Sequence, residues 1–104
     1  MNIEELNRIL EKRILILDGS MGTLIQQQLP DYKGLPDLLN LENPDLIASI
    51  HKSYIDSGAD VILTNTYGAS SIKLGEVGSG DNANKINSMA SMVCASGSRV
   101  TRLT

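Results

Sequence analysis

Two short apolar runs constrain most strongly what this chain can fold into. Residues 14–17 are Ile-Leu-Ile-Leu and residues 61–63 are Val-Ile-Leu, and both are apolar at every position rather than at alternate ones. Such short runs, ended by polar or glycine residues, are typical of strands covered on both faces. Because a helical pattern lies between them, we expect two parallel strands joined by a right-handed crossover.

Helical patterns surround these predicted strands. Residues 2–13 place apolar side chains at spacings of three and four. A second helix is predicted to start at Asn43-Pro44, because Asn caps free amides and Pro suits the first helical position. Gly58 is expected to end that helix in a left-handed conformation. Shorter or weaker helices are predicted at residues 24–28, 70–74 and 82–95.

Residues 29–41 are predicted to be a loop. Two prolines and a glycine interrupt any regular pattern there. Asp37 and Glu42 flank the loop, and no spacing pairs them as acid and base. His51 lies on or beside the apolar stripe of the next helix, where a packed or surface role is expected more than that of a base.

The order helix, strand, loop, helix, strand, helix predicts the α/β class. Two strands alone do not make a stable parallel sheet, because such sheets need several strands and cover on both faces. The 104 residues therefore read as the opening section of something larger, in a single partial domain spanning residues 1–104. Residues 75–104 contain three closely spaced glycines, a weak helical pattern and an end without a clear pattern. This part is therefore expected to diverge from the alternation of helices and strands predicted before it.

Composition excludes several classes of protein. A net charge of −3 argues against holding nucleic acid or an anionic membrane by bulk charge. No apolar run approaches the roughly 20 residues of a membrane span, and the acidic N-terminus does not read as a signal peptide. The single cysteine, Cys94, forms no internal disulfide and has no Cys or His at metal-ligand spacing. A cytoplasmic location and no metal ligands within the chain are expected.

The candidate site lies where the two predicted strands end. Its residues are Asp18, Gly19, Ser20, Thr64, Asn65 and Thr66. Ligands of α/β folds bind beyond the carboxyl ends of the strands, so both clusters would open onto one face. A carboxylate binds an ammonium group and free backbone amides bind a carboxylate, which suits the head group of an amino acid. An Asp-Gly pair after a strand is more often turn chemistry alone, and this alternative stays open.

Several sequence blocks, taken together, resemble the homocysteine S-methyltransferase family. In this chain they read LDGSMGT from Leu17, DLLNL from Asp37, PDLI from Pro44, HKSY from His51, GADVI from Gly58 and TNTYGA from Thr64. They are most similar to the N-terminal module of the cobalamin-dependent methionine synthases. The blocks follow the family's order from about residue 14 to residue 74.

The resemblance implies a (β/α)8 TIM barrel, of which this chain would hold the first βα units, incomplete. It also implies that Asp18 binds the amino group of homocysteine, that the amides of Gly19 and Ser20 bind its carboxylate, and that Thr64 lines the pocket with Asn65 and Thr66 adjacent. In the family, zinc held by three late cysteines activates the thiol. The methyl donor is methylcobalamin, or betaine or S-methylmethionine in relatives, supplied by a donor module or cofactor.

The late cysteines of the family have no counterpart in these 104 residues. The resemblance therefore implies a methyltransferase fragment that supplies part of the homocysteine pocket, is inactive alone, and lacks the zinc ligands. A truncated gene product, a frameshift near the end or a divergent fragment would each fit that description. Two alternatives remain: another anion-binding α/β barrel enzyme, and a non-catalytic or truncated α/β fragment.

Overall fold

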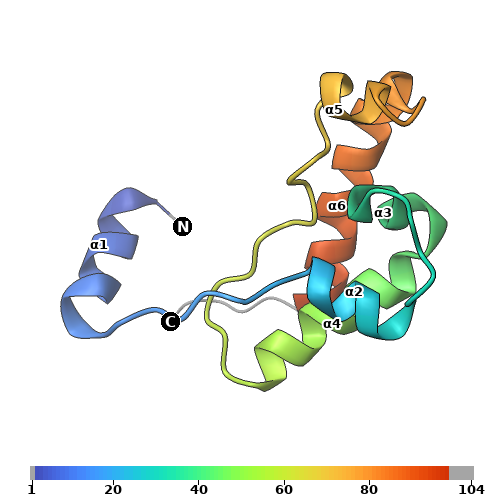
Figure 1. The fold of residues 1–104 in the computed structure, drawn as a ribbon. Coiled ribbons are helices and arrows are strands. Elements are labelled where there is room, and N and C mark those ends of the chain that lie inside the picture. Colours follow the sequence, from blue (N-terminus) through green and yellow to red (C-terminus); the bar gives the residue numbers. More distant parts are fainter. Residues whose placement is uncertain (1, 99–104) are drawn as a thin grey trace.

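The structure is a computed structural model that describes residues 2–98, with no side-chain detail for residues 97 and 98. These residues form helices joined by loops and extended segments (Figure 1). In chain order the elements are α1 (Ile3–Lys12), α2 (Gly22–Gln28), the 3-10 helix η1 (Pro36–Leu38), α3 (Leu39–Glu42), α4 (Pro44–Asp56), α5 (Ser71–Gly75), the 3-10 helix η2 (Gly80–Asn82) and α6 (Ala83–Ser98).

The predicted α/β fold class, with the first βα units of an incomplete TIM barrel, is wrong for this structure. The described residues contain no sheet, and the two apolar runs meet only in one isolated bridge between Leu17 and Val61. The bridge is parallel, as the order of elements predicted. A parallel pair needs further strands and cover on both faces to become a sheet. Here Ile14 remains 88% exposed and Leu17 58% exposed, so neither condition is met.

The main core lies between helices. It joins Ile25 of α2, Leu39 of α3, Ile47 and Ile50 of α4, and Val93 of α6. Each of these side chains is at most 5% exposed. Figure 1 shows α4 and α6 crossing at the centre of this helical body, with α2 and α3 beside them. Burial of these aliphatic side chains is the main stabilising contribution, because each removes apolar surface from water.

A second, smaller core lies at the N-terminal end of α6. Leu74 of α5 and Ile86 of α6 are fully buried there, and Ala69 is 4% exposed. Leucines from η1 and α3 pack against this cluster. The helices α5 and η2 are therefore attached to the body through α6 and the loop before α5.

Each of the predicted helices is present, with bounds that differ by a few residues. Asn43 caps α4 by accepting a hydrogen bond from the Leu46 N–H at 3.4 Å, and Gly58 follows with a φ of +109°. The prediction of a loop over residues 29–41 is wrong at its end, where η1 and α3 form. Pro36 begins η1, where its missing N–H costs nothing. The last helix is longer than predicted, and residues 99–104 lie outside the described part of the chain.

Residues 2–20 form an N-terminal arm. Figure 1 shows α1 standing apart from the helical body and joined to it by an extended segment. None of the residues of α1 is buried. The radius of gyration of 14.9 Å exceeds the about 13 Å of a compact chain of 100 residues, as expected for a projecting arm. Among the described residues, no helix has the length and apolar character needed to cross a membrane.

Candidate functional site

A small cavity lies where the arm meets the helical body. Its volume is about 180 Å³, and it is lined by Asp18, Gly19, Met21, Leu63, Thr64, Asn65, Thr66 and Tyr67. Five of the six residues predicted from the sequence are among these. Ser20, the sixth, follows Gly19 directly but does not line the cavity. The structure therefore brings together the two clusters that the sequence places 46 residues apart, from Asp18 to Thr64.

Asp18 joins the two walls of the cavity. Its backbone N–H donates to the carbonyl oxygen of Val61 at 2.9 Å, next to the bridge between Leu17 and Val61. Its side-chain oxygen Oδ2 accepts a hydrogen bond from the Leu63 N–H at 3.1 Å. Among residues 2–98 no donor pairs with its other oxygen, Oδ1. One carboxylate oxygen thus fixes the side chain, and the other remains available for a ligand.

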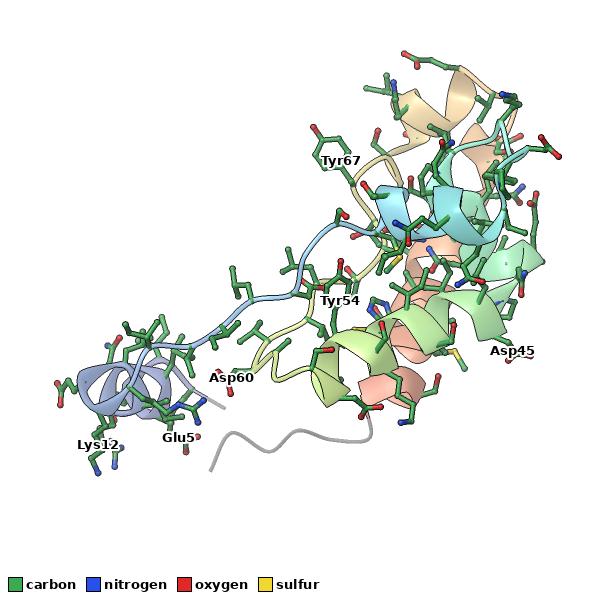
Figure 2. The ribbon with its side chains drawn as sticks, turned by 60° about the horizontal axis from the view of Figure 1, so that its bottom comes forward. Glu5, Lys12, Asp45, Tyr54, Asp60 and Tyr67 are labelled. Carbon is green, nitrogen blue, oxygen red and sulfur yellow. The ribbon has the colours of Figure 1, made fainter. Side chains whose placement is uncertain are left out.

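The backbone at Gly19 and Ser20 is held by Tyr54 of α4. The Tyr54 hydroxyl donates to the carbonyl oxygen of Ser20 at 2.5 Å. Figure 2 shows Tyr54 pointing from α4 toward the extended segment. A Cβ atom at position 19 would lie 2.9 Å from the Tyr54 hydroxyl oxygen, so a larger residue there would require the Tyr54 side chain to shift. Sequence reasoning missed this contact, although a phenol on the apolar stripe of α4 was the available signal.

The second wall is a tight turn. The Thr66 N–H donates to the carbonyl oxygen of Thr64 at 2.9 Å, and the two threonine hydroxyl oxygens lie 2.8 Å apart. Asn65, between them, is 6% exposed and donates its side-chain amide to the carbonyl oxygen of Pro36 at 2.8 Å. Its amide nitrogen is therefore engaged in the body. One of its two amide hydrogens is used in this bond, so a ligand can contact the second hydrogen or the side-chain oxygen.

The chemistry of this cavity suits a small ligand with a positive group. A carboxylate oxygen and two hydroxyls converge on a volume below the about 300–1,000 Å³ of typical small-molecule sites. Cationic ligands are attracted to Asp18, and the threonine hydroxyls both donate and accept hydrogen bonds. A larger hollow of about 560 Å³ lies between α2 and the following loop, but Lys33 is its only charged lining residue. We therefore assign the site to the smaller cavity.

A metal centre does not fit the described residues. Within residues 2–98 no group of three or more His, Cys, Asp or Glu side chains is placed to hold an ion. Burial raises the pKa of the Cys94 thiol, and the negative charge of Asp18 raises it further. The Cys94 thiol is therefore protonated at neutral pH, and it has no second thiol beside it because it is the only cysteine of the sequence. The zinc that the resemblance implies therefore has no ligand set here.

His51 is packed inside the helical body, which is one of the two roles, packed or surface, that the sequence left open for it. Its side chain is fully buried, and neither ring nitrogen has a hydrogen-bond partner in the described part of the chain. Burial lowers the pKa of His51, while the nearby charge of Asp18 opposes that shift. The imidazole is therefore neutral at physiological pH, and it does not line the cavity.

Comparison with known proteins identifies the family. The family described as homocysteine S-methyltransferase matches residues 15–101. The chain therefore belongs to the homocysteine S-methyltransferase family, as the sequence blocks predicted. It is also 38% identical over 74 residues to a protein named methionine synthase from Mycobacterium tuberculosis (strain ATCC 25618 / H37Rv). That match covers 65% of this chain, and the chain spans about 6% of the length of that relative.

Proposed function

We propose that this chain supplies part of the homocysteine pocket of a methyltransferase that converts homocysteine to methionine. Membership of the family supports the reaction class, and one structural observation supports the role of these residues. The Asp18 carboxylate and the turn at Thr64 and Thr66 line a single cavity of amino-acid size. This juxtaposition of a carboxylate with two hydroxyls carries the proposal.

Each group of the ligand has a proposed partner. The free oxygen of Asp18 binds the ammonium group, because a charge-assisted hydrogen bond is the strongest contact that this cavity offers. The backbone N–H group of Gly19, which lines the cavity, and that of Ser20, which follows it just outside the lining, bind the carboxylate. The threonine hydroxyls of the second wall complete the polar contacts, and Met21 and Leu63 provide apolar surface for the sulfur-bearing chain.

Our proposal gives these residues no step of the methyl transfer itself. Family chemistry through zinc and a methyl donor such as methylcobalamin requires groups that the described residues do not provide. We therefore propose that this 104-residue chain binds homocysteine but does not methylate it alone. A cytoplasmic location is proposed with it, because a single cysteine is compatible with a reducing compartment.

Calorimetric titration of the chain with homocysteine tests the proposal. We expect Asp18→Asn to weaken binding about 10- to 150-fold, since a hydrogen bond to a charged group contributes about 1.5–3 kcal/mol. Asp56→Asn is the matched control, because it removes the same charge from an exposed carboxylate that pairs with Lys52 on α4. Equal affinity of Asp18→Asn and the unmodified chain, or no binding by either, would contradict the proposal.

A further inference from the structure

Three buried polar side chains lie behind the second wall of the cavity. They are Asp37 of η1, Asn40 of α3 and Asn65 of the wall itself, with exposed fractions of 3%, 0% and 6%. We call these three residues the polar brace. Buried polar groups destabilise a fold unless they form hydrogen bonds, so the bonds of the brace determine where these segments sit.

Asn40 links the body to the wall through one amide nitrogen. Its Nδ2 donates to the carbonyl oxygen of Asp37 at 2.9 Å and to that of Asn65 at 2.8 Å. Asn65 returns a bond from its own Nδ2 to the carbonyl oxygen of Pro36 at 2.8 Å. Both amide hydrogens of Asn40 are therefore used, and the side chain cannot turn over without losing them.

Asp37 holds the wall at a second point. Its carboxylate oxygen Oδ2 accepts a hydrogen bond from the Gly68 N–H at 3.0 Å. A Cβ atom at position 68 would lie 3.0 Å from the other oxygen of Asp37, so a larger residue there would displace the carboxylate. The two fixed points, at Asn65 and Gly68, enclose Thr66 and Tyr67, which line the cavity.

We propose that Asp37 and Asn40 are positioning residues of the homocysteine site. Neither lines the cavity. They act through Asn65 and Gly68, which they hold so that the hydroxyls of the wall face the ligand. This inference rests on the proposed function, because it names residues that homocysteine binding requires without touching homocysteine.

The bonding of Asn40 indicates a role beyond filling space. Its Oδ1 atom is buried without a partner among the described residues, which is unfavourable. A leucine would avoid that orphaned oxygen, but it would remove the side-chain donor to the carbonyl oxygen of Asn65; the carbonyl oxygen of Asp37 would keep the Leu39 N–H. The amide therefore specifies one conformation of the wall, and a buried network of this kind orders its surroundings when its members are bonded.

Variants of the brace test the inference. Homocysteine affinity is measured by calorimetry at a temperature where circular dichroism shows each variant to be as helical as the unmodified chain. We expect Asp37→Ala and Asn40→Ala to weaken binding about tenfold, the equivalent of about one buried hydrogen bond. Asp37→Asn keeps an oxygen that accepts from Gly68, so it should bind within about twofold of the unmodified chain.

Asn87 provides a matched control. Its side-chain amide donates to the carbonyl oxygens of Ala69 and Ala83, both at 2.8 Å, just as Asn40 bridges two carbonyl groups. Asn87 does not line the cavity, and its bonds hold the chain beyond the wall. Asn87→Ala should therefore leave homocysteine affinity unchanged. An equal loss in Asn87→Ala and Asn40→Ala would show that the effect is general loosening, and it would overturn the inference.

A second measurement applies if the alanine variants do not fold. Gly68→Ala displaces the Asp37 carboxylate from the wall side, and it should weaken binding while raising amide exchange at residue 68 more than at Leu63. Unchanged affinity in Gly68→Ala, or in folded Asp37→Ala, would overturn the positioning role while leaving the proposed function intact. Absence of homocysteine binding by the unmodified chain would refute the proposed function, and the positioning role with it.

Discussion

The helical body and the N-terminal arm contain the same kinds of apolar residue, yet they bury them to opposite extents. Ile47 of α4 is fully buried, whereas Ile14 of the arm is 88% exposed. In the body, α4 and α6 each present an apolar stripe to the other and to α2 and α3. In the arm, α1 and the extended segment have no such partner. Burial is therefore decided by the number of neighbouring elements rather than by the apolar character of a segment.

The candidate site lies on the boundary between these two regions. The arm contributes Asp18, and the body holds the wall at residues 64–67 through the polar brace. Figure 2 shows Asp60 beside the extended segment of the arm, and Arg13 of the arm pairs with Asp60 at 2.5 Å. Four predictions follow from the contrast between the regions, in order of decreasing expected effect.

Substitution of one isoleucine by alanine in each region should show the largest difference between the body and the arm in the free energy of unfolding. Ile47→Ala removes a fully buried side chain and leaves a cavity, so it should lower the free energy of unfolding by about 2–5 kcal/mol. Ile14→Ala at an exposed position should change it by about 0.5 kcal/mol or less. Urea denaturation followed by circular dichroism measures both. Comparable losses would mean that the arm is packed as tightly as the body.

Acid should destabilise the body through His51. Its lowered pKa means that the unfolded chain takes up a proton below pH 6.5 while the folded chain does not. The contribution of His51 to the free energy of unfolding is therefore constant above about pH 6.5. It falls as the pH drops toward the lower pKa of the folded state, by up to about 1.4 kcal/mol per pH unit. Urea midpoints between pH 7 and pH 5 measure this slope, and His51→Leu should flatten it.

Asp60, where the arm meets the body, titrates in a lower pH range than His51. The Ile16 N–H and the Arg13 guanidinium lower the pKa of Asp60 from 3.8, so its contribution is lost only as the pH falls below that value. A slope between pH 7 and pH 5 that persists in His51→Leu would therefore not come from Asp60. It would contradict the assignment of the acid response to the buried imidazole.

Removal of the two asparagine caps should distinguish a packed helix from a free one. Asn43 caps α4 and Asn2 caps α1, where it accepts from the Glu5 N–H at 2.8 Å. Asn43→Ala should lower the free energy of unfolding of the body by about 1 kcal/mol. Asn2→Ala should reduce the helicity of α1 and leave the unfolding midpoint of the body unchanged. Equal shifts in the midpoint would show that α1 unfolds together with the body.

Loss of the Arg13–Asp60 ion pair should have the smallest effect. The Arg13 side chain is half exposed, and exposed pairs contribute little to stability. Arg13→Gln should leave the urea midpoint of the body nearly unchanged but increase amide exchange at Ile16, whose N–H donates to Asp60 at 3.0 Å. Added salt should produce the same change in the unmodified chain, since it screens exposed charges. Unaltered exchange at Ile16 in Arg13→Gln would show that the pair does not secure the arm.

The sequence predicted local elements better than it predicted their assembly. Helix periodicity and capping located α1 and α4 because both depend on residues three or four positions apart. The apolar run at residues 14–17 also predicted extended backbone, but a sheet depends on other strands and on cover that no local pattern encodes. The loop before Asn43 hid η1 and α3, because Pro36 can equally begin a helical turn or interrupt one.

The same division holds for the site. Asp18 and Thr64 were predicted to lie together because each follows an apolar run, and the structure has both lining one cavity; their binding of a ligand stays a prediction. Asp37 and Asn40 were missed, since their partners Gly68 and Asn65 are distant in the sequence and contribute backbone groups that carry no residue-specific signal. Side-chain bonds to distant backbone become visible only in three dimensions.

The central claim is that Asp18 and the wall at residues 64–67 together bind the head group of homocysteine. Its most direct test is a nuclear magnetic resonance titration of the 15N-labelled chain with homocysteine and with 4-mercaptobutanoic acid, which lacks the amino group. We expect saturable shifts at the amides of residues 18–20 and 63–67 with homocysteine, and about 10- to 150-fold weaker binding of 4-mercaptobutanoic acid, which cannot pair with Asp18. Equal affinities for both compounds, or shifts centred on the hollow beside Lys33, would contradict that claim.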